Sequence, residues 1–230
     1  MEGEDIRGMA FTPVLCGADE AGRGPVIGPM VVAAVKVDKE DFLREIGVRD
    51  SKKCTPQRRE RLAELIKDRC EYEILIVPPE EIDSMREQMT INELEVEVFA
   101  KVLNRLCSDG CELYLDAADV NEERFGEEIG RKLSFRPKKI VAKHGGDDMY
   151  PVVSAASILA KVSRDHEIER IKEELGEIGS GYPADPITKE FLKNWVKEHG
   201  DLPPYTRRSW KTAKRALESA KMRTLDDFMR

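Results

Sequence analysis

A pair of adjacent acids followed by a glycine-rich turn is the segment of this chain best suited to chemistry. Asp19 and Glu20 come after a short apolar run, and residues 22–24 read Gly-Arg-Gly. The β-branched run over residues 26–37 then predicts a strand. In this order the two carboxylates lie where a strand meets a loop. Hard cations such as Mg²⁺ bind carboxylates together with substrate phosphates. The segment therefore suggests a metal-dependent enzyme that cleaves phosphodiesters.

The same segment has two other interpretations. Acidic pairs at strand ends are common, and such loops often do no more than turn the chain; this interpretation stays open. The glycines at 22, 24 and 28 also come within one residue of the dinucleotide-binding fingerprint. That fingerprint must open a helix whose N-terminus holds the pyrophosphate. Residues 29–35 have the composition of a strand, so we reject a dinucleotide site.

Two more acidic segments follow predicted strands. Asp116 ends the strand predicted over residues 111–116, and the loop over residues 143–148 carries two glycines followed by two acids. Ligand-binding groups in sheet proteins gather at strand ends. A two-metal hydrolase needs carboxylates from several segments, because two cations roughly 4 Å apart must hold the attacking and leaving oxygens. In the alternative interpretation such an acid only caps the next helix, which suits Asp119 better than Asp116.

The elements that must position these acids follow from periodicity and turn residues. Strands come early and helices late, which predicts an α/β or α+β core with a small helical C-terminal part after a Gly- and Pro-rich break at residues 176–186. Thr55 before a proline is a typical helix start, and Ser154 is expected to open a long helix. The expected strands are residues 14–18, 29–37, 71–77, 111–116 and 139–142, and the expected helices are residues 79–87, 91–107, 121–133, 154–175, 187–198 and 209–220, with another from Thr55.

The composition predicts a cytoplasmic protein with a substantial core. Hydrophobic residues make up 40% and charged residues 36% of the 230. No apolar run approaches the ~20 residues of a membrane span, and the acidic N-terminus does not resemble a signal peptide. Five cysteines at scattered positions favour reduced, mostly buried thiols. Cys107 and Cys111 have no matching second pair, which argues against a zinc site.

The net charge of −7 argues against general nucleic-acid binding, but the charge is unevenly spread. Residues 205–223 contain many Lys and Arg residues and a single acid, Glu218. A basic face can follow a phosphate backbone. A solvated helix surface explains the same pattern, so both interpretations stay open.

Taken together, the motifs resemble those of ribonuclease HII, the type 2 ribonuclease H family, in its archaeal form. The matching segments occur in the family's order through almost the whole chain. They are residues 17–24, 50–53, 114–118, His144 with Asp147, residues 150–162 and residues 179–183. The resemblance implies a ribonuclease H-like α/β fold, in which a mixed β-sheet is flanked by helices. It also implies a catalytic domain over residues 1–178 and a helical substrate-binding part over residues 179–230.

The resemblance further implies an endonuclease that hydrolyses the RNA strand of RNA–DNA hybrids. Such an enzyme also cuts on the 5′ side of single ribonucleotides embedded in duplex DNA and leaves 3′-hydroxyl and 5′-phosphate ends. It uses Mg²⁺ or Mn²⁺ in a two-metal mechanism and serves ribonucleotide and primer removal in DNA replication and repair. We expect a monomer.

Four acids carry over from the family by position. The metal-binding and catalytic carboxylates would be Asp19, Glu20, Asp116 and Asp147. In the family the fourth acid lies three residues before a Tyr-Pro pair, which selects Asp147 over Asp148. The glycines that precede it depart from the family pattern. Asp165 is a competing acid, but its place inside the long predicted helix favours a solvated charge.

Substrate recognition follows from the resemblance in the same way. The 2′-hydroxyl distinguishes RNA from DNA, and the turn at residues 22–24 would bind it with backbone groups. Tyr182 would stack on the deoxy sugar of the next nucleotide, and Lys52 would contact a phosphate. Without the resemblance, Tyr182 is more simply a turn residue, and the role of His144 stays open. The predicted substrate-binding residues are Gly22, Arg23, Gly24, Lys52 and Tyr182.

The C-terminus carries a separate resemblance. Residues 222–229 resemble the peptide that archaeal replication proteins dock into the sliding clamp, with Leu225 and Phe228 as its apolar anchors. Met222 and Met229 replace the usual glutamine and second aromatic residue, and a frayed tail is the alternative. Two other functions would suit part of this sequence. One is that of a DNA-cleaving relative with the same fold, such as a resolvase or integrase, and the other is that of a non-catalytic hybrid-binding module. The intact set of acids and the Gly-Arg-Gly turn argue against both.

Overall fold

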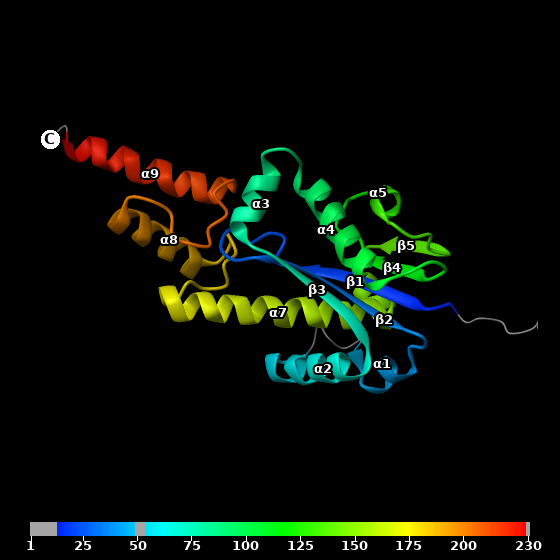
Figure 1. Ribbon diagram of the computed structural model, residues 1–230. Helices are drawn as coiled ribbons and strands as arrows, with labels where there is room; N and C mark the ends of the chain where they lie inside the picture. The colour runs from blue at the N-terminus through cyan, green and yellow to red at the C-terminus, as the bar shows by residue number, and fades with distance from the viewer. Residues whose placement is uncertain (1–12, 49–53, 229–230) are drawn as a thin grey trace, which may run out of the picture.

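The computed structural model describes residues 13–48 and 54–228, with side chains as far as residue 219. Its centre is a five-stranded sheet in the order β3-β2-β1-β4-β5 (Figure 1). β1 pairs antiparallel with β2 and parallel with β4, β2 pairs antiparallel with β3, and β4 pairs parallel with β5. The strands are β1 (Leu15–Ala21), β2 (Met30–Val37), β3 (Glu71–Val77), β4 (Glu112–Asp116) and β5 (Lys139–Lys143). The predicted fold class, a mixed sheet flanked by helices, is confirmed.

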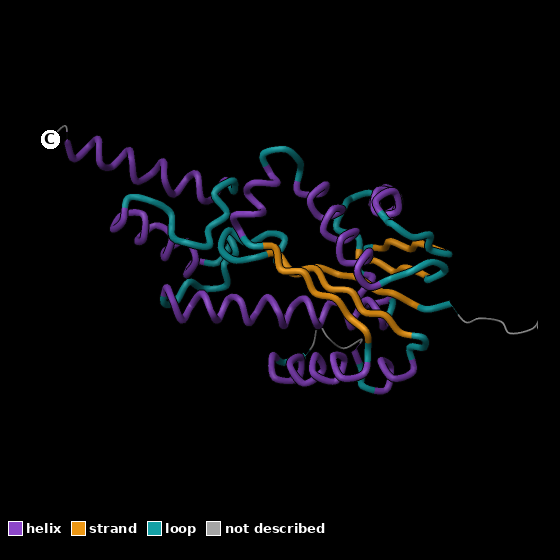
Figure 2. The backbone as a smooth tube through the Cα atoms, viewed as in Figure 1, coloured by secondary structure: helices purple, strands orange, loops and turns teal. Residues whose placement is uncertain are grey.

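Helices cover both faces of the sheet (Figure 2). α7 and α2 pack on one face, and α4 and α5 pack on the other. Each face buries its own apolar cluster, because successive side chains of a strand point to opposite sides. The helices are α1 (Asp41–Glu45), α2 (Pro56–Arg69), α3 (Pro79–Arg86), α4 (Ile91–Leu106), α5 (Glu122–Lys132), α6 (Gly146–Met149), α7 (Pro151–Leu175), α8 (Pro186–His199) and α9 (Lys211–Phe228).

Helix α7 lies close against β1 because the residues at the contact are small. Gly17 faces the first turn of α7, and a Cβ at that position would collide with the backbone of Val152. The expected start of this helix at Ser154 is wrong by three residues. Pro151 takes the first helical position, where its missing N–H has no partner to lose, and the Ser154 hydroxyl donates to the carbonyl of Asp147 instead.

Strand β1 runs further than the sequence indicated. It was expected to end at residue 18, before the acids, but it continues through them to Ala21 because β2 pairs with it along its whole length, including Glu20 with Val32. Asp19 and Glu20 therefore lie inside a strand and not in the loop after it. The short helix α6, which holds Asp147, also escaped prediction; four residues are too few for a periodic pattern.

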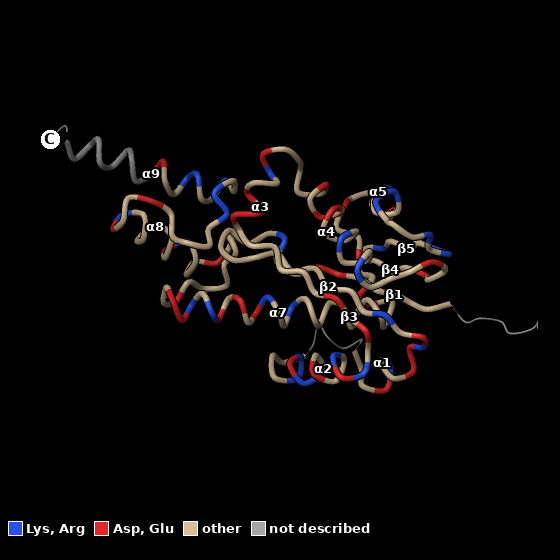
Figure 3. The backbone as a smooth tube through the Cα atoms, in the orientation of Figure 1, with Lys and Arg blue, Asp and Glu red and all other residues tan. Residues whose placement is uncertain are grey.

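The helical C-terminal part packs on the far half of α7 and on the loop between β1 and β2. A separate apolar cluster fills this contact, with Ile27 and Ile171 from the core side and Leu192 and Ala213 from α8 and α9. Lys and Arg gather where the chain enters α9 (Figure 3). Among the residues that the structure describes, none of the helices has both the length and the apolar composition needed to cross a bilayer.

Candidate active site

Three of the four predicted carboxylates meet where the neighbouring strands β1 and β4 end, and this end of the sheet is called the acidic edge below. β4 pairs with β1 only as far as Ala18 opposite Leu115, so Asp19 and Glu20 extend past the pairing, and Asp116 is the last residue of β4. The strands are parallel, so their carboxyl ends reach the same edge. One carboxylate oxygen from each of Asp19, Glu20 and Asp116 lies within 4.8 Å of the others.

The adjacent acids reach this edge from opposite faces of the sheet. Asp19 lies on the α7 face, where its carboxylate accepts a hydrogen bond from Ser157 and feels the charge of Lys161. Glu20 lies on the α4 face, within electrostatic range of Glu95. The two acids of β1 therefore meet different surroundings: Ser157 and Lys161 on α7 stabilise the charge of Asp19, whereas Glu95 on α4 repels that of Glu20.

Asp147 is not part of this group of three, but contacts made by Gly146 and Lys161 connect it to the group. The Gly146 N–H donates to Oδ1 of Asp116 at 2.6 Å, which holds α6 against the end of β4. Lys161 Nζ lies 3.7 Å from Oδ2 of Asp147 and donates to the Ser157 hydroxyl at 2.6 Å. Asp147 is only 4% exposed, whereas its neighbour Asp148 is exposed.

The crowding of these acids shifts their protonation. Burial, followed by the charge of Asp116, raises the pKa of Asp19 from 3.8 to about 7. Burial, followed by the charge of Asp19, raises the pKa of Glu20 well above its ordinary value. The buried Oε2 of Glu20 has no hydrogen-bond partner among the described residues. Converging, desolvated oxygens of this kind suit a hard divalent cation, which would supply the missing charge and ligand.

A buried arginine binds the backbone carbonyls of the Gly-Arg-Gly turn next to the acids. Arg207 is 0% exposed, and its guanidinium donates to the carbonyls of Gly22, Arg23 and Gly28 at 2.6, 2.8 and 3.0 Å. The Trp210 indole N–H donates to the Gly24 carbonyl at 3.3 Å. Burial lowers the pKa of Arg207 to about 9. These bonds fix the peptide planes of the turn.

The side chain of Arg23 is tied to α4. Its Nε lies 2.7 Å from Oε1 of the buried Glu95, and its Nη2 donates to Oδ1 of Asn92 at 2.6 Å. Asn92 in turn donates to Asp119 at 3.0 Å. Burial raises the pKa of Glu95 to about 7 although Arg23 opposes that rise. The one long side chain of the turn is therefore bound to α4, through Glu95 and Asn92.

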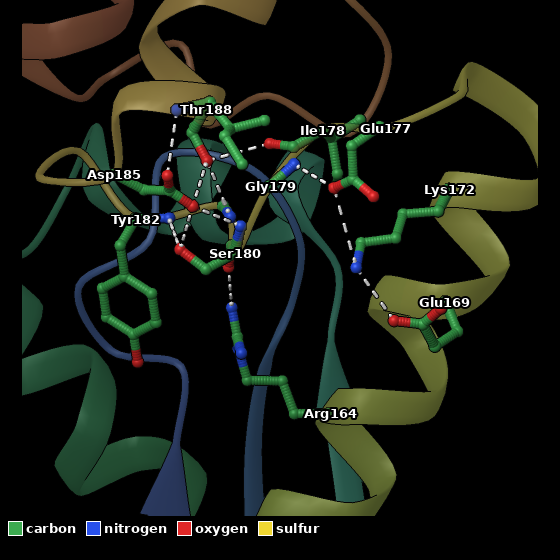
Figure 4. Close-up of polar contacts among 12 residues, drawn as sticks. Arg164, Glu169, Lys172, Glu177, Ile178, Gly179, Ser180, Tyr182, Asp185 and Thr188 are labelled. Atoms are coloured by element: carbon green, nitrogen blue, oxygen red, sulfur yellow. Dashed lines mark hydrogen bonds and ion pairs between the residues drawn. The ribbon is translucent and has the colours of Figure 1, made fainter.

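Tyr182 stands beside this turn (Figure 4). A Cβ on Gly24 would lie 3.6 Å from the Tyr182 ring, and the ring lies 5.1 Å from the Arg164 guanidinium carbon. Arg164 also donates to the Ser180 carbonyl at 3.0 Å, and Asp185 accepts from the Ser180 N–H at 2.6 Å. The ring is 40% exposed. The loop that carries it is thus rigid, and its aromatic face stays accessible.

The remaining predicted residues are not brought together in the same way. Lys52 lies outside the described residues. Asp165 is 48% exposed and pairs with Arg59 at 3.0 Å, as a solvated helical charge should. The His144 ring lies 3.1 Å from the carbonyl of Ala117, in the loop after β4.

Four residues at the site escaped prediction from the sequence. Lys161 lies four residues after Ser157, so the two share a helix face, and that spacing was the one local signal. Glu95 lay in an ordinary amphipathic helix. Arg207 lay in the basic stretch that we interpreted as a phosphate-binding or solvated face, and Arg164 lay next to the acid we discounted. Their partners are distant in sequence, which no local pattern reveals.

Solved structures of known proteins share this fold. The solved structure of ribonuclease H2 from Pyrococcus horikoshii OT3 superposes with a TM-score of 0.85 at 45% identity, covering 90% of this chain and 99% of that one. Ribonuclease HII in the structure of its complex with PCNA from Archaeoglobus fulgidus superposes with a TM-score of 0.81 at 46% identity, covering 88% of this chain and 96% of that one. The fold is thus that of a type 2 ribonuclease H.

The sequence comparisons name the family. The family model described as Ribonuclease HII matches residues 16–213. Ribonuclease HII from Thermococcus kodakarensis is 53% identical over 227 residues, covering 94% of this chain and 98% of the relative. The chain therefore belongs to the ribonuclease HII family, and it is a hydrolase, an endoribonuclease. The resemblance stated from the motifs is confirmed.

The raised pKa of Asp19 predicts a metal-linked pH dependence of stability. Between pH 4 and 7 the metal-free folded state binds more protons than the unfolded chain, so its unfolding free energy falls as pH rises through about 7. Each affected group contributes up to about 1.4 kcal/mol per pH unit. Thermal melts in chelator should therefore show a melting temperature that drops from pH 5 to pH 8, and Mg²⁺ should reverse the drop.

An Asp19→Asn variant should lose much of this pH dependence and its response to Mg²⁺. Asp68→Asn, at an exposed position on α2, is the matched control and should behave as the unmodified chain. Equal pH profiles for all three proteins would contradict the crowding of ionisable carboxylates at this edge.

Proposed function

We propose that this protein cuts the RNA strand of RNA–DNA hybrids and cuts on the 5′ side of single ribonucleotides in duplex DNA. The observation that carries this proposal is the convergence of three carboxylates within 4.8 Å, next to a turn whose carbonyls are anchored from behind. The products would be a 3′-hydroxyl and a 5′-phosphate. This chemistry suits ribonucleotide and primer removal in DNA replication and repair.

Each residue has a specific role in this proposal. Asp19, Glu20 and Asp116 hold divalent cations, Mg²⁺ or Mn²⁺, with Asp147 completing the set. When bound, the cations supply Lewis acidity and neutralise charge that develops on the phosphate oxygens. Lys161 contacts both Asp147 and Ser157, and its positive charge stabilises the ionised form of Asp19. No side-chain nucleophile is needed.

Recognition of the ribonucleotide is assigned to the backbone. The 2′-hydroxyl both donates and accepts hydrogen bonds, so the fixed peptide groups of residues 22–24 can select it. Tyr182 lies beside Gly24, where its exposed ring can pack against the sugar of the following nucleotide. A 2′-hydroxyl on that following sugar would clash with the ring or lose its solvation. The ring therefore favours a deoxy sugar at this position. Lys52 would contact a phosphate.

Removal of one carboxylate charge should abolish cleavage and leave the fold intact. Asp116→Asn keeps the shape of the side chain but cannot balance a cation. We expect the rate of cleavage of a duplex with one ribonucleotide to fall by about a thousandfold or more. Asp148→Asn, at the exposed neighbour of Asp147, is the matched control and should retain activity.

The same assay locates the cut and tests the proposed function. A Mg²⁺- or Mn²⁺-dependent cut on the 5′ side of the ribonucleotide, absent from an all-DNA duplex, is the expected result. If only long hybrids were cut, the recognition assigned to the turn and Tyr182 would be wrong, while the metal site would stand. Normal turnover by Asp116→Asn would remove that residue from the site.

Loss of the Tyr182 ring should weaken junction cutting selectively. Stacking of an aromatic ring on a nucleotide contributes about 1–3 kcal/mol, so Tyr182→Ala should reduce cleavage at single ribonucleotides roughly 5- to 150-fold. Cleavage within long hybrids should change less. Ile187→Ala, at an exposed apolar residue of α8, is the control. Equal losses on both substrates would argue against a role at the junction.

We also propose that the C-terminal end of the chain binds a sliding clamp through Leu225 and Phe228. Two observations support this: the resemblance of residues 222–229 to a clamp-binding peptide, and the similarity to a ribonuclease HII whose structure was solved in complex with PCNA. α9 projects away from the sheet (Figure 1), so its end is well separated from the candidate active site.

Clamp binding is testable without disturbing the nuclease. A Leu225→Ala, Phe228→Ala double variant should bind an archaeal clamp at least tenfold more weakly in calorimetric titration, because apolar anchors dominate such interfaces. Its cleavage of short duplexes should not change. Thr224→Ala controls for any substitution in the tail. Unaltered affinity of the double variant would exclude these anchors.

A further inference from the structure

Three of the five cysteines form a cluster that the nuclease site does not use. The sulfurs of Cys16, Cys107 and Cys111 all lie within 4.8 Å of one another, and those of Cys16 and Cys107 are 2.7 Å apart. Cys16 lies near the start of β1, four residues before Glu20, so a strand rise of about 3.3 Å per residue separates the cluster from the carboxylates by roughly 13 Å.

The fold brings a third cysteine, Cys16, beside Cys107 and Cys111, which are too few by themselves to hold a metal ion. We argued against zinc because Cys107 and Cys111 had no second pair, and the pairing of β1 with β4 now brings Cys16 beside them. Cys107 ends α4, where its N–H donates to the Leu103 carbonyl at 2.8 Å. Cys111 directly precedes β4, and its carbonyl accepts from Lys138 N–H at 2.8 Å.

Backbone contacts fix this arrangement without help from the thiols. The loop between Cys107 and Cys111 turns at Gly110, which has φ +81°, and the Gly110 N–H donates to the Arg136 carbonyl at 2.9 Å. The Asp109 carboxylate accepts from the Arg136 N–H at 2.7 Å. The backbone therefore holds the three cysteines near one another before any ion binds. Cys107 is partly exposed, which gives an ion a route from solvent.

The geometry suits one small ion. Zinc–sulfur bonds are about 2.3 Å long, so two sulfurs in tetrahedral coordination lie roughly 3.8 Å apart. The sulfurs of Cys16 and Cys107, which are 2.7 Å apart, must therefore separate by about 1 Å when the ion binds. Iron–sulfur clusters usually take four cysteines, and a disulfide would use only two of these three. Lys36 lies opposite Cys16 in the β1–β2 register, and its ammonium, paired with Glu71 at 2.6 Å, can offset thiolate charge.

We propose that Cys16, Cys107 and Cys111 form a second metal site, specific for a soft ion such as Zn²⁺ and separate from the nuclease centre. Thiolates select soft and borderline ions over Mg²⁺. The bound ion would join the start of β1, the end of α4 and the start of β4. Its role is structural, because roughly 13 Å of strand separates the cluster from the carboxylates.

Cadmium provides a direct probe, because cadmium–thiolate bonds absorb in the near ultraviolet. The full chain is reduced, stripped of metal and titrated with Cd²⁺ in excess Mg²⁺, which saturates the carboxylates. We expect one thiolate-bound Cd²⁺ per chain. Zn²⁺ should then compete for the site and raise the melting temperature by about 4 °C or more.

Cys107→Ser tests the assignment at the partly exposed position. We expect it to weaken Cd²⁺ binding at least tenfold and to remove the thermal shift, while Mg²⁺-dependent cleavage persists and reports a folded chain. The control is the Cys54→Ser, Cys70→Ser double variant, which alters the cysteines outside the cluster and should bind as the unmodified chain does. An absent charge-transfer band, or equal binding by Cys107→Ser, would overturn the proposal. So would a Cys16–Cys107 disulfide in anaerobically purified protein that takes up no metal after reduction.

Discussion

The repulsion among Asp19, Glu20 and Asp116 is the constraint on which the rest of this structure depends. Parallel pairing of β1 and β4 drives the three carboxylates to one desolvated edge, where ionisation is costly without a cation. A loose scaffold would relieve the strain by moving the strands apart. Here the contact of Gly17 with α7 and the bond from Gly146 to Asp116 prevent that movement. The stability of the core thus keeps the three repelling carboxylates together in the absence of a cation that would offset their charge.

Each surrounding layer of the protein contributes to the site. α7 supplies Ser157 and Lys161, which stabilise the charge of Asp19 on one face of the sheet. α4 supplies Glu95, whose negative charge adds to the cost of ionising Glu20 on the other face. The C-terminal part supplies Arg207, whose bonds to the turn connect the helices after residue 179 to the acidic edge. A basic residue that local charge assigns to the surface is therefore buried, where it anchors the backbone of the turn beside the acids.

The sequence identified features set by local chemistry and missed those set by distant contacts. Asp116 could be located because an acid at the end of an alternating strand has a fixed place in a sheet. The course of β1 through Asp19 and Glu20 could not, since it depends on the length of pairing with β2. Arg207 has its partners across the fold, at Gly22, Arg23 and Gly28, and its residue type alone carries no signal. The start of α7 at Pro151 was missed because a serine three residues later is also a good cap.

The two ends of β1 carry different kinds of ligand atom. One end carries oxygen donors at Asp19 and Glu20, and the other carries the sulfur of Cys16, grouped with two more thiols. Hard ions prefer the first set and soft ions the second. The strand pairing that forces the carboxylates together also brings Cys16 to the start of β4, since register along a parallel pair is shared from end to end. A metal held by the thiols would therefore reinforce the pairing that assembles the acids, without competing for the ions that the acids bind.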